Sequence, residues 1–233
     1  MSHTFLDTEA DTLDHPNSTY AIERQQLKNE IALRMAEDAE RLALLESRAQ
    51  SIPLSEDVVR EGGVAPDFAA TSIEGQSLRL SRLLRSGPVV LNFYRGGWCP
   101  FCNLELRELQ EVLPQIKAFG GSLIAISPEV PERAAQVAAR LDERFTIVSD
   151  QDNALSRLFG LTFTVDPELL PLYDRLGIDL EAANGNRDFE IPIPATYVIG
   201  RDSRVAKAFI ERDYTQRMEV RDILMALKSL RKL

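Results

Sequence analysis

The chain has 233 residues, of which 44% are hydrophobic and 27% charged, a composition that allows one large domain or one domain with an appendage. Its formal net charge of −9 argues against nucleic acid and anionic membranes as partners, because both bind basic surfaces. No apolar run in the sequence approaches the roughly 20 residues that a helix needs to span a bilayer.

Two segments of different character precede the larger part of the chain. Residues 1–19 form a polar, acidic tail without the basic start and apolar stretch of a secretory signal, so we expect a cytoplasmic protein. Between residues 20 and 50, apolar side chains recur every three or four positions, which predicts one long amphipathic helix. Its apolar stripe must pack against another surface. That surface belongs either to its own domain, to a second copy of the chain or to a different protein. We therefore divide the chain into a tail and helix over 1–54 and a domain over 55–233.

In the second region, short apolar strands alternate with amphipathic helices. Strands are predicted over 67–73, 76–80, 88–94, 122–127, 145–148, 195–200 and 204–210, and helices over 81–85, from the cysteines to about 119, and over 131–143 and 214–230. Such alternation implies parallel pairing with right-handed crossovers, and the last two strands form a hairpin. The sequence therefore predicts an α/β fold with a central mixed sheet flanked by helices. It leaves open whether the segment 160–190 covers the site.

The two cysteines, Cys99 and Cys102, follow a buried strand and begin a long helix. The glycines Gly96-Gly97 allow a sharp turn before them, and Pro100 suits the first helical turn. Unpaired N–H groups and the helix dipole stabilise a thiolate at this position, and the spacing brings both sulfurs to one face of the helix. This arrangement predicts a reversible disulfide, with two inert buried thiols as the alternative.

Neither a metal nor a structural disulfide is expected from these cysteines. Structural zinc takes four ligands, and the only histidines, His3 and His15, lie in the polar tail. A bridge between residues three positions apart closes almost no loop, so it stabilises little. We predict no cofactor.

Polar residues that follow the predicted strands 88–94 and 204–210 are candidates to support the thiols. Arg95 precedes the cysteines and Arg217 follows the last strand, so both are candidate cations, with solvated surface positions as the alternative. Asp213 and Tyr214 are candidates to hold substrate. Asn92, inside a buried strand, is expected to pair with nearby backbone.

Pro194 opens the strand that we expect to run antiparallel to residues 88–94, which places it beside the cysteines. A cis proline there leaves a backbone edge open to an extended substrate. An ordinary trans proline in a loop is the alternative.

At these residues the sequence resembles the AhpC/TSA group of the thioredoxin superfamily, in particular the peroxiredoxin-like proteins that carry a CxxC motif. The matching stretches are 65–68, 89–102, 194–199 and 213–217. The resemblance implies a thioredoxin-like fold over most of residues 60–230. It also favours the cis form at Pro194, and it adds Trp98 and Pro100 to the candidate site.

The sequence departs from the peroxiredoxin motif Pro-x-x-x-Thr-x-x-Cys. Laid on that motif without gaps, Cys102 takes the position of the attacking cysteine. Cys99 then replaces the threonine, Arg95 replaces the proline, and Pro194 falls on the position of a distant arginine. The groups that orient a peroxide are therefore missing, and a CxxC motif with a candidate cis-proline takes their place, as in thioredoxin.

Three functions are compatible with this pattern. In a thiol peroxidase, Cys102 forms a sulfenic acid, Cys99 resolves it as a disulfide, and an external dithiol reductant of thioredoxin or glutathione type resets the pair. In a thioredoxin-type disulfide reductase, Cys99 attacks a substrate disulfide and Cys102 releases the product. In a redox-sensing binding protein, the N-terminal helix docks a partner according to the thiol state. A homodimer through that helix is also expected.

Overall fold

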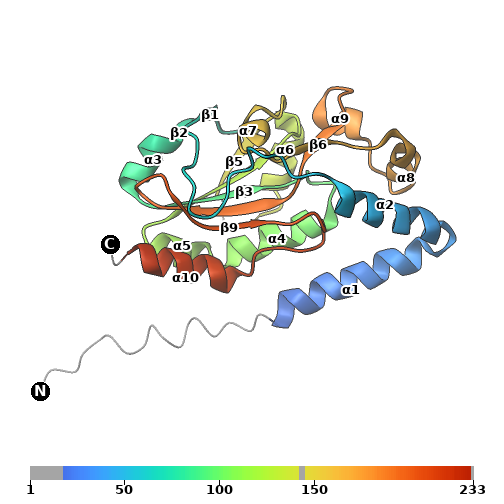
Figure 1. Ribbon diagram of the computed structural model, residues 1–233, viewed down its shortest axis with the longest axis horizontal. Coiled ribbons are helices and arrows are strands. Elements are labelled where there is room, and N and C mark those ends of the chain that lie inside the picture. Colours follow the sequence, from blue (N-terminus) through green and yellow to red (C-terminus); the bar gives the residue numbers. More distant parts are fainter. Residues whose placement is uncertain (1–17, 142–144, 232–233) are drawn as a thin grey trace, which may run out of the picture.

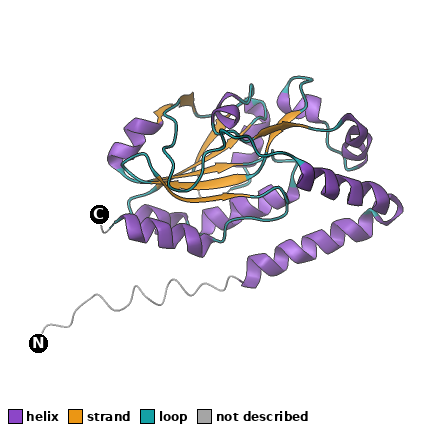
Figure 2. Ribbon diagram, viewed as in Figure 1, coloured by secondary structure: helices purple, strands orange, loops and turns teal. Residues whose placement is uncertain are grey.

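The computed structural model describes residues 18–141 and 145–231, so the tail over 1–17, with both histidines, lies outside the described residues. Its centre is a sheet, drawn in orange in Figure 2. The sheet is mixed and its strand order is β5-β4-β3-β8-β9. The strands are β3 (Val89–Phe93), β4 (Ser122–Ser127), β5 (Thr146–Ser149), β8 (Ala195–Ile199) and β9 (Val205–Ile210). β3, β4 and β5 pair in parallel, whereas β8 runs antiparallel to both of its neighbours. The predicted α/β fold with a mixed sheet is confirmed.

Helices cover one face of this sheet. α4 (Pro100–Glu111), α5 (Leu113–Ala118) and α10 (Val220–Leu230) bury their apolar stripes against β3 and β8, and α6 (Pro131–Ala138) packs near β4 and β5. The single helix expected from the cysteines to residue 119 is broken at Val112, because Pro114 has no N–H to donate to the carbonyl four residues earlier.

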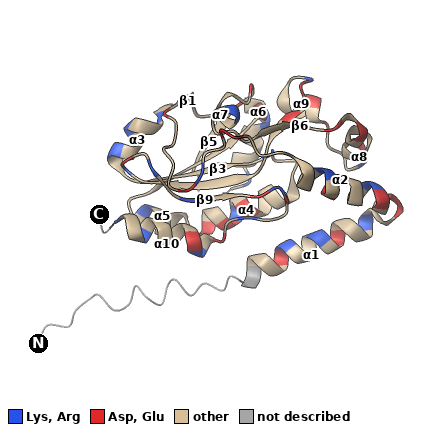
Figure 3. Ribbon diagram, in the orientation of Figure 1, with Lys and Arg blue, Asp and Glu red and all other residues tan. Residues whose placement is uncertain are grey.

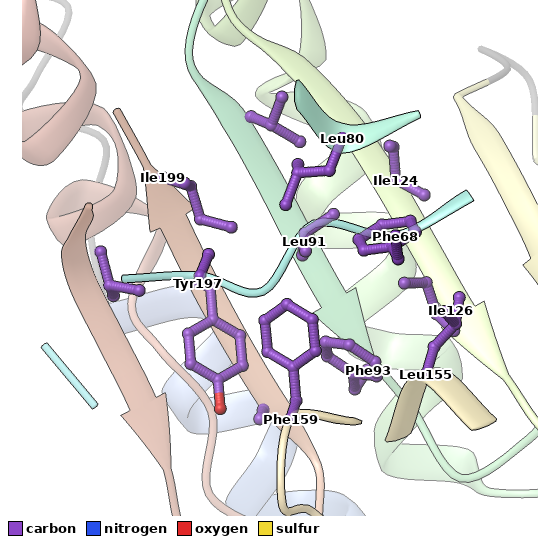
Figure 4. Close-up of a cluster of buried hydrophobic side chains, with 14 of the residues drawn as sticks. Phe68, Leu80, Leu91, Phe93, Ile124, Ile126, Leu155, Phe159, Tyr197 and Ile199 are labelled. Carbon is purple, nitrogen blue, oxygen red and sulfur yellow. The ribbon is translucent and has the colours of Figure 1, made fainter. Parts of the chain in front are cut away.

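The opposite face carries a second apolar cluster, in which Phe93, Phe159 and Tyr197 pack ring against ring (Figure 4). It is covered by α3 (Leu80–Ser86), α7 (Ala154–Leu158) and a small ribbon of β1 (Ala69–Thr71) and β2 (Ser77–Arg79). All five residues of β3 are buried, as its unbroken apolar run predicts for a strand between two layers.

The N-terminal segment folds back on itself, and the prediction of one long helix is wrong. α1 (Ser18–Arg34) is followed by the short 3-10 turn η2 (Ala36–Asp38) and by α2 (Ala39–Ser51), which returns beside α1 (Figure 1). Lys28 on α1 and Glu46 on α2 form an ion pair, and both signs of charge lie along the two helices (Figure 3). The apolar stripe is thereby divided between two clusters of the same chain.

Residues 160–190, whose conformation the sequence left open, form a compact excursion from the sheet. Its ends pair as β6 (Thr162–Thr164) and β7 (Glu190–Pro192), and between them lie η3 (Pro167–Leu169), α8 (Leu170–Arg175) and α9 (Leu180–Asn184). Leu45 of α2 packs in one apolar cluster with Leu172 and Tyr173 of this excursion. The N-terminal helices and the excursion therefore meet over the end of β3.

The closing helix is shorter than predicted, since α10 begins at Val220 rather than at residue 214. The side chain of Asp213 instead accepts hydrogen bonds from the amide and hydroxyl of Thr215 (3.0 and 2.6 Å), which holds residues 213–217 as a loop. No helix among the described residues is long and apolar enough to cross a membrane.

Candidate active site

The turn between β3 and α4 places both cysteines at the start of the helix. Gly96 has φ +149, and a Cβ there would lie 2.3 Å from Trp98 Nε1, so only glycine fits. The amide of Gly97 donates to Glu129 Oε2 at 2.7 Å, which fixes the turn. Cys99 is the N-cap residue of α4, and Cys102 lies in its first turn.

Both cysteines are free thiols, and both are buried, with exposed fractions of 2% for Cys99 and 0% for Cys102. Cys99 is the less buried of the two, but the N-terminal helices and α8 cover most of its surface. A cavity of about 380 Å³ remains between these helices and the cysteine. This covered cavity is lined by Met35, Leu45, Arg95, Trp98, Cys99 and Tyr173, among others. Cys99 therefore lines a partly open cavity that the helices cover on one side, with Cys102 behind it.

The two thiols differ in acidity because they share a hydrogen bond. Burial raises the pKa of the Cys99 thiol, but the hydrogen bond from Cys102 and the guanidinium groups of Arg95 and Arg217 outweigh burial and lower it to about 6. Burial and the bond to Cys99 raise the pKa of Cys102. The pair therefore holds one thiolate at neutral pH, on Cys99, and keeps the proton on Cys102.

Arg95 is one source of positive charge at the site, and it is 4% exposed, so the solvated alternative is wrong. Its guanidinium carbon lies 4.9 Å from the ring centroid of Tyr214 and 5.0 Å from that of Trp98, and a terminal nitrogen donates to the hydroxyl of Tyr173. Arg95 forms no ion pair with any described carboxylate, and its Nε has no hydrogen-bond partner there. The aromatic rings thus hold a cation in place without neutralising it.

Arg217 is the second source of positive charge at the site, and it contacts the thiol of Cys102. One terminal nitrogen lies 3.3 Å from Cys102 Sγ, and its Nε donates to Glu105 Oε2 at 2.5 Å. Glu105 also accepts from Asn92 (2.9 Å) and from the hydroxyl of Thr196 (3.1 Å). The expectation that Asn92 pairs with backbone is wrong, because the buried carboxylate of Glu105 takes its amide.

The other predicted site residues differ in how close they lie to the cysteines. Tyr214 packs its ring edgewise on Phe101 at 5.8 Å and lines the covered cavity, as does Trp98. Pro194 lies in a neighbouring cavity of about 240 Å³ that also reaches Arg95. Asp213 shapes its loop through Thr215, as described above.

The expectation of a cis peptide at Pro194 is wrong, because no described peptide bond is cis. The chain runs directly from β7 through Ile193 into β8, and the amide of Ile193 donates to the carbonyl of Leu161. The backbone edge that a cis proline was expected to leave open is therefore already used by the excursion over residues 160–190.

Three residues of the site were not found from the sequence. Tyr173 belongs to the excursion, whose path no local pattern reveals. Glu105 lies three residues after Cys102 on the buried face of α4. A carboxylate is unusual at such an apolar position, so this residue could have been found from the sequence. Glu129 lies beyond β4, and burial raises the pKa of its carboxyl group.

Known proteins resemble this chain in sequence and in fold. The model of the AhpC/TSA family matches residues 62–208. The thiol-disulfide oxidoreductase ResA of Geobacillus kaustophilus is 30% identical over 173 residues, which are 74% of this chain and 79% of that protein. Peroxiredoxin Bcp of Escherichia coli is 25% identical over 103 residues, 44% of this chain and 65% of that protein. The crystal structure of the peroxidoxin BcpB from Mycobacterium tuberculosis superposes with a TM-score of 0.56 at 22% identity, covering 74% of this chain and 98% of that one.

Proposed function

This chain belongs to the AhpC/TSA family, and from that premise we propose that it is a thiol-dependent peroxidase that reduces hydroperoxides with the dithiol of Cys99 and Cys102. It is an oxidoreductase, since its relatives are peroxiredoxins and thiol-disulfide oxidoreductases. The observation that carries the proposal is the pair of buried thiols sharing one proton between two buried guanidinium groups, with Cys99 facing a cavity.

The proposed reaction has two steps on the enzyme. A thiolate attacks one peroxide oxygen, so that a sulfur–oxygen bond forms, the oxygen–oxygen bond breaks and the alcohol leaves with a proton. The second thiol then attacks the sulfenic sulfur, a disulfide forms and water leaves. The sulfur is oxidised, and the peroxide is reduced.

The order of attack is part of the proposal. The alignment with the peroxiredoxin motif predicts Cys102 as the attacking residue, and this prediction is untested. Two features favour Cys99 instead: its thiol has a lowered pKa of about 6, and it lines the covered cavity, whereas Cys102 is fully buried behind it. We therefore assign the sulfenic acid to Cys99 and the resolving thiol to Cys102. When the disulfide is reduced, Arg217 favours the departure of Cys102 as a thiolate.

Stoichiometric peroxide titration of two serine variants tests this assignment. Cys102→Ser should still form about one sulfenic acid per chain, trapped by a dimedone-type reagent, because Cys99 has no partner to resolve it. Cys99→Ser should consume peroxide far more slowly, and the double variant gives the background. The reverse result would return the attacking role to Cys102, and no consumption above background in the unmodified chain would reject the peroxidase function.

A thiol-disulfide reductase is the second candidate, supported by the similarity to ResA and by Cys99 as the sulfur nearer to the surface. The same variants separate it in an insulin reduction assay, where Cys99→Ser should abolish attack. Rapid insulin reduction together with negligible peroxide turnover would favour this alternative over the peroxidase.

Finer features of the protein are proposed with it. An external thiol reductant regenerates the dithiol, and the cytoplasm suits a chain whose only cysteines serve redox chemistry.

A homodimer is supported by Ile22 and Leu33, which are 53% and 79% exposed on α1. If the double variant Ile22→Asp/Leu33→Asp has the same mass in solution as the unmodified chain, that result would argue against a dimer through α1. The division at 54/55 is supported by the family match, which begins at residue 62.

A further inference from the structure

The covered position of Cys99 restricts what can reduce the enzyme. Cysteines joined in a disulfide have their Cα atoms within about 7 Å of each other, so a protein reductant would have to bring its own backbone that close to Cys99. Yet Cys99 is 2% exposed, and the cavity beside it is walled by residues of α1, α2 and α8 such as Ile31, Leu45 and Tyr173. A protein cannot enter this space while the helices stay in place. A small thiol can, since about 380 Å³ lies within the range of small-molecule sites, about 300–1,000 Å³.

The charge of the cavity indicates which small thiols fit. Although the chain carries a net charge of −9, the described lining of the covered cavity holds three arginines, Arg34, Arg95 and Arg175, and no acidic residue. Arg175 is paired with Asp38 outside the lining, and Arg34 forms no ion pair with the described residues. A ligand that carries carboxylates therefore meets unneutralised positive charge at the exposed Arg34 and at the buried Arg95.

Formation of the disulfide increases this preference. In the reduced protein the thiolate of Cys99 is the anion that faces Arg95, and its charge contributes to the raised pKa of that guanidinium. The disulfide carries no charge, so oxidation leaves Arg95 buried without any described anion, and an uncompensated buried charge is costly. The oxidised enzyme is thus the state that gains most from an anionic ligand in the cavity.

We propose that the covered cavity is a binding site for a small thiol bearing carboxylates, which reduces the Cys99–Cys102 disulfide in place; this rests on the disulfide cycle of the proposed function. The carboxylates lie toward Arg34 and Arg95, and the thiol reaches Cys99. A protein dithiol is the competing reductant.

The reduction takes two equivalents of the thiol. The first, as a thiolate, attacks Cys99 Sγ, so that a mixed disulfide forms, the Cys99–Cys102 bond breaks, and Cys102 leaves as a thiolate beside Arg217 before taking up a proton. The second thiolate attacks the sulfur of the bound small thiol, which leaves as the symmetric small disulfide and returns Cys99 as a thiolate. The enzyme disulfide is reduced, and the two small thiols are oxidised.

The test uses the full-length chain, oxidised with diamide so that disulfide formation does not depend on peroxide turnover. Its reduction is followed by stopped-flow fluorescence of Trp98, the single tryptophan, which lines the cavity. The probes are glutathione, with two carboxylates, its diethyl ester, with the same thiol and ammonium group but neither carboxylate, and a thioredoxin. We expect saturation with glutathione, and a rate at low concentration about tenfold above that with the ester, because two screened charge contacts are lost.

A charge reversal at the cavity and a matched reversal elsewhere complete the design. Arg34→Glu should raise the half-saturating glutathione concentration about fivefold, and Arg34→Gln by an intermediate amount. Arg82→Glu, the same change at an exposed position of α3, should leave it unchanged. The ester has lost both carboxylates and keeps only its ammonium group, so none of the three variants should raise its half-saturating concentration.

Two results would overturn the inference. One is a linear concentration dependence, with equal rates for glutathione and its ester and no effect of Arg34→Glu. The other is reduction by thioredoxin at rates far above those with glutathione, which would mean that the helices move aside for a protein. If peroxide fails to form the disulfide while the disulfide made with diamide is reduced as expected, the peroxidase proposal fails and the cavity assignment stands.

Discussion

At the scale of single residues, the site depends on where one proton and two guanidinium groups lie. Cys99 and Cys102 share the proton, Arg95 faces the first thiol and Arg217 the second. The thiolate is the reactive form and exists above its pKa, so a lowered pKa makes Cys99 reactive in mildly acidic solution.

The alkylation rate of Cys99 should therefore follow pH with a midpoint near pH 6. Below the midpoint the rate should fall about tenfold per pH unit, and above about pH 7 it should level off. Iodoacetamide labelling with mass spectrometry of the peptide measures it. In Cys102→Ser a hydroxyl replaces the thiol that donates a hydrogen bond to the Cys99 thiolate, so the midpoint of the Cys99 alkylation profile should shift. A midpoint above pH 8 in the unmodified chain would show that the thiolate is not stabilised.

Arg217 has both a structural and an electrostatic role, and a pair of variants separates them. Arg217→Met leaves the carboxylate of Glu105 buried without its cation, which should cost about 3–5 kcal/mol of unfolding free energy and slow the reaction with peroxide. Adding Glu105→Gln should restore most of the stability in urea unfolding but not the rate. Recovery of both would mean that Arg217 acts only by neutralising Glu105.

At the scale of elements, α1 is fastened to the domain by one buried arginine. Arg24, whose side chain is 10% exposed, lies 3.3 Å from Glu108 on α4 and also pairs with Glu219 ahead of α10. Burial raises the pKa of Glu108 to about 8, although Arg24 opposes this. The folded protein therefore keeps a proton on Glu108 that the unfolded chain releases above about pH 4.5. The contribution of Glu108 to stability falls as pH rises from about 5 to 8.

Arg24→Ala should release α1 and should do so in a pH-dependent way. At pH 8, loss of the cation beside a buried carboxylate should lower the unfolding free energy by about 2–3 kcal/mol and speed alkylation of Cys99. At pH 5, where Glu108 is protonated, the loss should be smaller. Arg41→Ala, which removes an exposed ion pair with Asp38, is the control and should cost under about 1 kcal/mol. Equal losses at both pH values would contradict this account of Glu108.

At the scale of the whole molecule, stability is unevenly distributed between the sheet and its cover. Every residue of β3 and β8 is buried between two layers, whereas α1 and α2 bury only part of one face and leave Ile22 and Leu33 exposed. Amides of β3 and β8 should exchange hydrogen only on global unfolding, and those of α1 by local opening with a lower free energy. Hydrogen exchange with mass spectrometry measures both, and exchange in α1 as slow as in β3 would contradict this picture.

Much of the fold followed from local pattern. The apolar run of β3, the glycine turn and the helix that begins at the cysteines are each set by neighbouring residues, so sequence alone located them. Helix ends were less well predicted, because the break at Val112 depends on a single proline and the loop before α10 depends on Asp213 and Thr215.

The sequence by itself determined the α/β class, the family and the two sulfurs, because periodicity and a motif at a strand–helix junction are local properties. Only the tertiary structure decided that both thiols are buried, that Arg217 meets Cys102 across 115 positions, and that Tyr173 closes the site. These contacts join distant segments, and their formation depends on which apolar faces pack together. The same packing divided the N-terminal stripe between two helices and so placed a covered, positively charged cavity beside Cys99.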